Sequence, residues 1–155
     1  MSEEVGGAEA TRSALARLAE ALLQYYNVTE PPVPIERMLQ KPPAGLAGVD
    51  PSQISTIIEH GLYRYEPRLA MARLLYREIV RIVADGRALG VDVPSSVSYA
   101  DVKFFARCLL MPSLWVRGLV ELGLSVEQMS VRLQVPSYAL VTRMAELGLP
   151  IPGTG

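Results

Sequence analysis

The sequence predicts a mainly α-helical protein, built as a single multi-helix domain. Three observations favour this fold class. Apolar residues recur at steps of three and four residues over most of the chain, as they do on one face of a helix. Capping residues, prolines and glycines stand at the ends of these segments. The chain has 155 residues, half of them hydrophobic and a fifth charged, which suits one globular domain. The alternative is an α+β fold with a small remnant β-sheet.

The N-terminal region is expected to contain a tail and two helices. Residues 1–10 are expected to form a flexible tail ahead of the domain, which covers residues 11–150. A helix is predicted from about Thr11 to Tyr26, because four apolar residues share one face: Leu15, Leu18, Leu22 and Tyr25. Prolines then interrupt the chain, and a short helix is predicted near Ile35.

Two structures are open for residues 51–62, which follow a proline- and glycine-rich connection over 41–50. Asp50, Pro51 and Gly61 are placed as the N-cap, the first residue and the C-terminal stop of a helix. The β-branched residues of STIIE favour a strand instead. We expect a helix. A strand at this position would instead belong to the small β-sheet of the alternative α+β fold.

Five helices are predicted in the C-terminal part. The longest runs from about Glu66 to Ala84 and is followed by a loop over 85–98. The next opens at Tyr99 and stops at Pro112. Three shorter helices follow, with these start and stop signals: Ser113, the capping box Ser125–Gln128, Ser137, Gly123 and Gly148.

Composition limits the class of protein. The formal net charge of −1 supplies no positive field to attract phosphates, so nucleic acid is not the expected partner. The single cysteine, Cys108, cannot form an internal disulfide and fits a reducing compartment. The first ten residues resemble no signal peptide, and no apolar run reaches the roughly 18 residues of a membrane span. These features predict a cytoplasmic protein with no membrane contact.

Residues for metal or nucleophilic chemistry are scarce. A zinc site needs about three ligands, yet the chain has one histidine, His60, and one cysteine. Cys108 lies in the apolar run FARCLLM and is expected to be a small, inert, buried residue. No glycine-rich phosphate loop is present. The sequence therefore predicts neither a metal nor a cofactor.

Residues 125–149 have the spacing of a helix-turn-helix. A DNA-recognition helix presents several polar or basic side chains to bases and phosphates. The second helix offers only one basic residue among its candidates: Ser137, Tyr138, Thr142, Arg143 and Glu146. We therefore interpret the pair as a packing unit and keep DNA binding as an alternative.

Three motifs resemble the ImmA/IrrE family of zinc metallopeptidases, which act on transcriptional repressors. FARCLLMP (105–112) is similar to the family's F-A-x-x-L-L-M-P helix ending. RMAELGL (143–149) is similar to its closing R-L-x-x-L-G-L, and PPVPIERML (31–39) to its proline-introduced helix. The resemblance extends over about residues 12–149 and implies a helical scaffold with a short pair of helices near its end.

The family's metal site has no counterpart here. RLAMARLLYR (68–77) falls in register with its R-F-T-L-A-H-E-L-G-H helix, so Arg73 and Arg77 replace the zinc histidines and Leu74 the general-base glutamate. Tyr99 or Asp101 stands where the third, acidic ligand belongs. Guanidinium groups have no lone pair to give a metal, and leucine cannot activate water. The resemblance thus implies a pseudoenzyme. The alternative is that the match is accidental and the arginines form a solvated helix face.

Three functions follow as hypotheses. The first is a protein-interaction or regulatory module that binds a protein partner or a second copy of itself. In it, Arg73 and Arg77 would clamp an internal carboxylate such as Asp101 in place of the metal. The second is DNA binding through 125–149. The third is binding of a small anionic ligand at Arg73 and Arg77, since arginine pairs suit carboxylate and phosphate.

Overall fold

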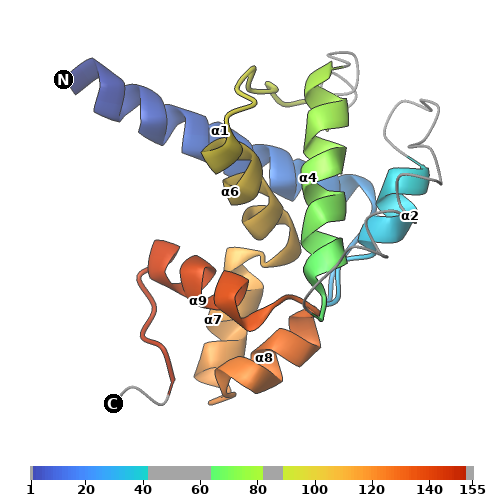
Figure 1. The fold of residues 1–155 in the computed structure, drawn as a ribbon, viewed down its shortest axis with the longest axis vertical. Coiled ribbons are helices and arrows are strands. Elements are labelled where there is room, and N and C mark those ends of the chain that lie inside the picture. Colours follow the sequence, from blue (N-terminus) through green and yellow to red (C-terminus); the bar gives the residue numbers. More distant parts are fainter. Residues whose placement is uncertain (1, 42–63, 82–88, 153–155) are drawn as a thin grey trace.

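A computed structural model describes residues 2–41, 64–81 and 89–152 (Figure 1). In these ranges the chain forms helices and no strand, so the predicted mainly helical fold is confirmed. Residues 51–62, with His60, lie outside the described residues, so the choice between helix and strand there stays a prediction. No helix in the described ranges combines the length and apolarity that crossing a bilayer requires. The helices are α1 (Ser2–Tyr25), α2 (Ile35–Gln40), α4 (Glu66–Arg81), α6 (Tyr99–Leu110), α7 (Ser113–Glu121), α8 (Val126–Leu133) and α9 (Ser137–Glu146).

Helix α1 begins at Ser2, so residues 2–10 of the expected tail are helical, and their flexibility stays a prediction. Residues 6–10 are exposed, and the start of the helix extends beyond the other helices (Figure 1). The packed part of α1 begins near Leu15, and extending an existing helix by a residue costs far less than starting a new one. This is the physical reason that the exposed residues continue it.

Helix α6 lies at the centre of the fold. It packs against α1, α4 and α9 and is buried along most of its length. Tyr76 of α4 and Phe105 of α6 are both fully buried, and their ring centroids lie 4.8 Å apart. The packing of α4 against α6 therefore fixes the positions of the side chains on these two helices that point toward α9.

Arg68 is a buried charge that joins three parts of the chain. Its guanidinium donates to both carboxylate oxygens of Glu36 on α2, at 3.1 and 3.2 Å, and to the carbonyl oxygen of Val33 at 2.5 Å. Its Nε donates to the carbonyl oxygen of Gln134, in the turn between α8 and α9, at 3.0 Å. One side chain of α4 thus fixes α2 and the C-terminal helix pair.

The helix-end signals are confirmed in part. The capping box forms, because Ser125 and Gln128 each bond the other's backbone N–H. Ser113 and Ser137 were expected as N-caps, but both are the first residues of their helices. A proline with extended ψ precedes each and takes the cap position, with no side-chain cap bond.

The loop before α6 is fastened to α4 by Tyr76. Its hydroxyl donates to the carbonyl oxygen of Ser96 at 2.6 Å. Burial, and secondarily the nearby charge of Asp101, raises the pKa of Tyr76 from 10.0 to about 12.

Stability should therefore fall as the pH rises from about 10 to 12. In this range the unfolded chain ionises its tyrosine while folded Tyr76 keeps its proton, so the unfolded state binds fewer protons and is favoured. Tyr76→Phe should be less sensitive to this change, because it cannot ionise. Urea unfolding at several pH values measures the difference, with exposed Tyr25→Phe as the control. A Tyr76→Phe variant with an unaltered pH profile would contradict the assignment.

Candidate functional site

A cavity of about 390 Å³ lies where α4, α6 and α9 meet. We call it the basic cavity, because three of its side chains are cations and one is an acid. Its walls are formed by Glu66, Leu69, Arg73, Tyr99, Lys103, Ala106, Arg107, Tyr138, Ala139 and Thr142.

The charges of the basic cavity are not all neutralised. Arg107 forms a two-pronged ion pair with Glu146 of α9, with both N···O distances at 2.9 Å. The Lys103 ammonium lies 4.2 Å from the centroid of the Tyr99 ring. Arg73 forms no hydrogen bond or ion pair with any residue that the structure describes. Two cations, Arg73 and Lys103, therefore line the cavity without a carboxylate partner among the residues that the structure describes.

The acidic side chain of the cavity is already engaged. The Tyr138 hydroxyl of α9 donates to the Glu66 carboxylate at the start of α4. This bond connects α4 with α9 without cancelling the charge of the carboxylate, so the cavity wall carries three cations and one acid. A carboxylate or phosphate is the chemical group that suits such a surface.

The residues expected at the degenerate metal site are brought together only in part. Arg73 and Tyr99 line the same cavity, whereas Arg77 is exposed one turn along α4 and lies outside it. Leu74 packs against the hydrophobic core. Asp101 accepts a hydrogen bond from Ser96 Oγ at 2.5 Å, and no ion pair between it and either arginine occurs in the described ranges. The internal clamp on Asp101 is thus not formed in this structure.

The described residues offer no cluster of metal ligands. Among the residues that the structure describes, no three histidine, cysteine, aspartate or glutamate side chains gather as ligands. The register that would place zinc ligands puts the guanidinium of Arg73 there, which repels a dication. Cys108 is buried, and burial raises the pKa of its thiol to about 11, against partly compensating charges such as Arg143. It is therefore a poor nucleophile.

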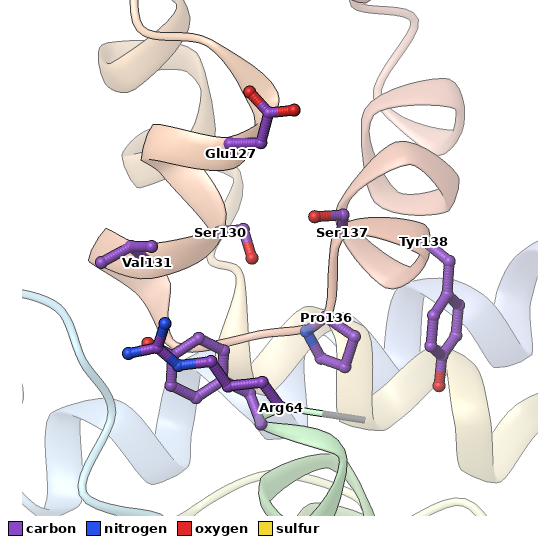
Figure 2. A pocket seen from close by; sticks show the side chains of 8 residues that line it. Arg64, Glu127, Ser130, Val131, Pro136, Ser137 and Tyr138 are labelled. Carbon is purple, nitrogen blue, oxygen red and sulfur yellow. The ribbon is translucent and has the colours of Figure 1, made fainter. Parts of the chain in front are cut away.

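A second cavity, of about 470 Å³, lies between α8 and α9 above the start of α4 (Figure 2). We call it the interhelical cavity. Its wall is largely apolar and shares Tyr138 with the basic cavity. The lining residues are Arg64, Tyr65, Glu127, Ser130, Val131, Pro136, Ser137 and Tyr138.

The second helix of the helix-turn-helix-like pair offers little to DNA. Arg143, the sole basic residue in the sequence of α9, is buried, and its Nε donates to the carbonyl oxygen of Met111 at 2.9 Å. Glu146 is held by Arg107, and Thr142 Oγ1 donates to the carbonyl oxygen of Tyr138 in its own helix. A recognition helix without an exposed cation lacks the phosphate contacts on which DNA affinity depends.

Lys103 and Arg107 were not among the predicted site residues, although the sequence contains a signal for them. Tyr99, Lys103 and Arg107 follow one another at four-residue steps and so share one face of α6. Tyr138 had no such signal, because only the fold brings α9 to this face.

Comparison of the sequence with protein-family models, and of the chain with curated proteins and solved structures, gave no match. The resemblance to the ImmA/IrrE family therefore rests on its sequence motifs alone.

Proposed function

We propose that the protein is a non-catalytic, protein-binding regulatory module that receives an anionic group of its partner in the basic cavity. The observation that carries this proposal is the position of Arg73. It shares the cavity with Lys103 and has no partner within the described ranges.

The non-catalytic part of the proposal is supported by the chemistry of the residues present. An active metallopeptidase would have to keep its ligands and its base, and here the positions in register carry Arg73, Leu74 and Arg77. Leu74 is packed on the core, and the Glu66 carboxylate of the cavity is engaged by Tyr138. The cavity wall contains no histidine, cysteine or serine, the side chains that most often serve as base or nucleophile.

The binding part is supported by electrostatics. Partly burying two cations without a counter-ion is costly, and an incoming carboxylate or phosphate recovers that cost through charge-assisted hydrogen bonds. The Tyr99 hydroxyl in the wall adds a hydrogen-bond donor near the cations, whereas the hydroxyls of Tyr138 and Thr142 already donate within the protein. An anion is therefore bound more tightly here than at a solvated arginine.

Inorganic phosphate should bind in the basic cavity and shift the NMR signals of Arg73 Nε–H and of the Tyr99 and Lys103 amides. Arg73→Gln should weaken this binding by about fivefold to tenfold, as loss of roughly 1 kcal/mol or more of charge-assisted bonding requires. The measurement is a phosphate titration followed by ¹H–¹⁵N correlation spectra. Arg132→Gln, at an exposed arginine of α8 outside both cavities, is the matched control and should leave the titration unaltered. Equal affinity in Arg73→Gln would remove the proposal.

A further inference from the structure

Building on the function proposed above, we propose that the basic cavity and the interhelical cavity together bind one extended peptide segment of the partner. A large apolar side chain of the segment enters the interhelical cavity, and a carboxylate a few residues away enters the basic cavity. The proposal depends on three features: the shared wall of the cavities, the apolar surface of one, and the charge of the other.

The two cavities meet at a single side chain. Ser137 lines the interhelical cavity, whereas Tyr138, the next residue, borders both. In Figure 2, Ser137 faces the gap between α8 and α9, and Tyr138 lies on the other side of α9. Its hydrogen bond to Glu66 holds this dividing side chain against α4. Since an extended chain advances about 3.3 Å per residue, a peptide crossing Tyr138 reaches both cavities within a few residues.

The interhelical cavity suits an apolar group. Tyr65, Val131 and Pro136 supply carbon surface, and Val131 and Tyr138 are 53% and 52% exposed. Two polar groups in the wall are not directed at a ligand in the cavity. Ser130 Oγ donates to the carbonyl oxygen of Val135 at 2.5 Å, and the carboxylate of Glu127 points away from Ser130 and Ser137 (Figure 2). An apolar side chain in this cavity removes carbon surface from water on both partners.

Charge selects an acidic segment over a basic one. Arg73 and Lys103 lie at one end, and Arg64, whose guanidinium lies 4.9 Å from the centroid of the Tyr65 ring, borders the other. None of these three cations forms an ion pair with a residue in the described ranges. A segment that carries glutamate or aspartate complements them, and one that carries lysine is repelled.

The openness of the surface favours a chain segment over a small organic acid. Pockets for small molecules enclose most of the ligand. Here the half-exposed walls at Val131 and Tyr138 leave one side open to solvent. A peptide segment can bind to such an open surface, because the rest of the segment remains part of the partner protein. Its contacts are divided between one apolar side chain and one carboxylate.

The test uses fluorescein-labelled glycine–serine peptides that carry one leucine and one glutamate, separated by one to four residues. Their affinity for the full chain is measured by fluorescence anisotropy. One spacing should bind about tenfold more tightly than the same peptide with leucine replaced by serine, or with glutamate replaced by glutamine. Arg73→Gln should abolish the advantage of glutamate, and Val131→Asn should abolish the advantage of leucine. Arg132→Gln is the control and should preserve both.

The outcomes separate this inference from the function on which it rests. If phosphate binds at Arg73 and leucine gives no gain at any spacing, the two-cavity site is wrong while the anion site stands. If neither phosphate nor any peptide binds, both proposals are wrong. Peptide binding that is insensitive to Arg73→Gln and Val131→Asn also overturns the inference, because it places the peptide elsewhere.

Discussion

Replacing Arg68 by methionine should lower the free energy of unfolding by about 2–4 kcal/mol, one of the two largest effects that we expect from a single substitution. Methionine retains much of the volume of the arginine stem but has no donors. The carbonyl oxygens of Val33 and Gln134 would each lose a hydrogen bond, and the Glu36 carboxylate would lose its ion pair. The Arg68 side chain is 9% exposed, so water cannot easily replace these bonds.

The choice of control follows from burial. Arg81→Met breaks an ion pair on the same helix, with Glu78, but the Arg81 side chain is 67% exposed. It should cost less than about 1 kcal/mol. Glu36→Gln should lie between the two, because the Glu36 side chain is 46% exposed and its charge can be hydrated. Urea unfolding followed by circular dichroism gives all three values. An Arg68→Met protein as stable as the parent would mean that desolvation of the charge cancels its hydrogen bonds.

Arg68 also shows where sequence-based reasoning reaches its limit. The periodicity of residues 66–81 predicts the helix, since an apolar stripe at helical spacing identifies it without any other part of the chain. The periodicity gives no sign that Arg68 is buried in a charge network. Its partners at Glu36 and Gln134 lie 32 and 66 residues away, and only the tertiary fold brings them together.

The predictions of helix ends were likewise right where the signal was local and wrong where a neighbouring residue competed. The capping box at Ser125 is fully local, because both of its hydrogen bonds join residues three apart, and it is confirmed. Ser113 and Ser137 are good N-cap residues by type, yet the proline before each adopts the extended cap conformation and shifts the helix start by one residue. The proline precedes each serine directly, so the sequence alone contained the information needed to place the N-cap at the proline.

The candidate site was predictable on one helix and not across helices. Aligning residues 68–77 with the family motif pointed to Arg73, and Tyr99 was a named candidate beside it. Both line the basic cavity. Arg77 follows Arg73 by one turn of α4, yet Arg73 lines the cavity and Arg77 is exposed outside it. Side-chain partners that depend on the packing of a third helix could not be deduced from spacing.

Glu146→Gln should move stability and anion affinity in opposite directions. The substitution preserves the shape of the side chain and removes the charge that neutralises Arg107. Both side chains are largely buried, with exposures of 17% for Arg107 and 12% for Glu146. An uncompensated charge at this depth should lower the free energy of unfolding by about 2–4 kcal/mol. The same unpaired cation borders the basic cavity, so phosphate should bind there roughly threefold to tenfold more tightly.

Urea unfolding and the phosphate titration, performed on the same variants, measure the two effects. Glu78→Gln removes the carboxylate of an exposed pair on α4 and should alter neither quantity appreciably. Arg107→Gln should lower both stability and affinity, because it removes the cation as well as the pair. A purely structural role for Arg107 predicts that Glu146→Gln destabilises the fold without strengthening phosphate binding. That result would mean that Arg107 does not contribute to anion binding, and that Arg73 and Lys103 are the cations of the site. The burial that makes the Arg107–Glu146 ion pair stabilising would then also keep Arg107 away from a bound anion.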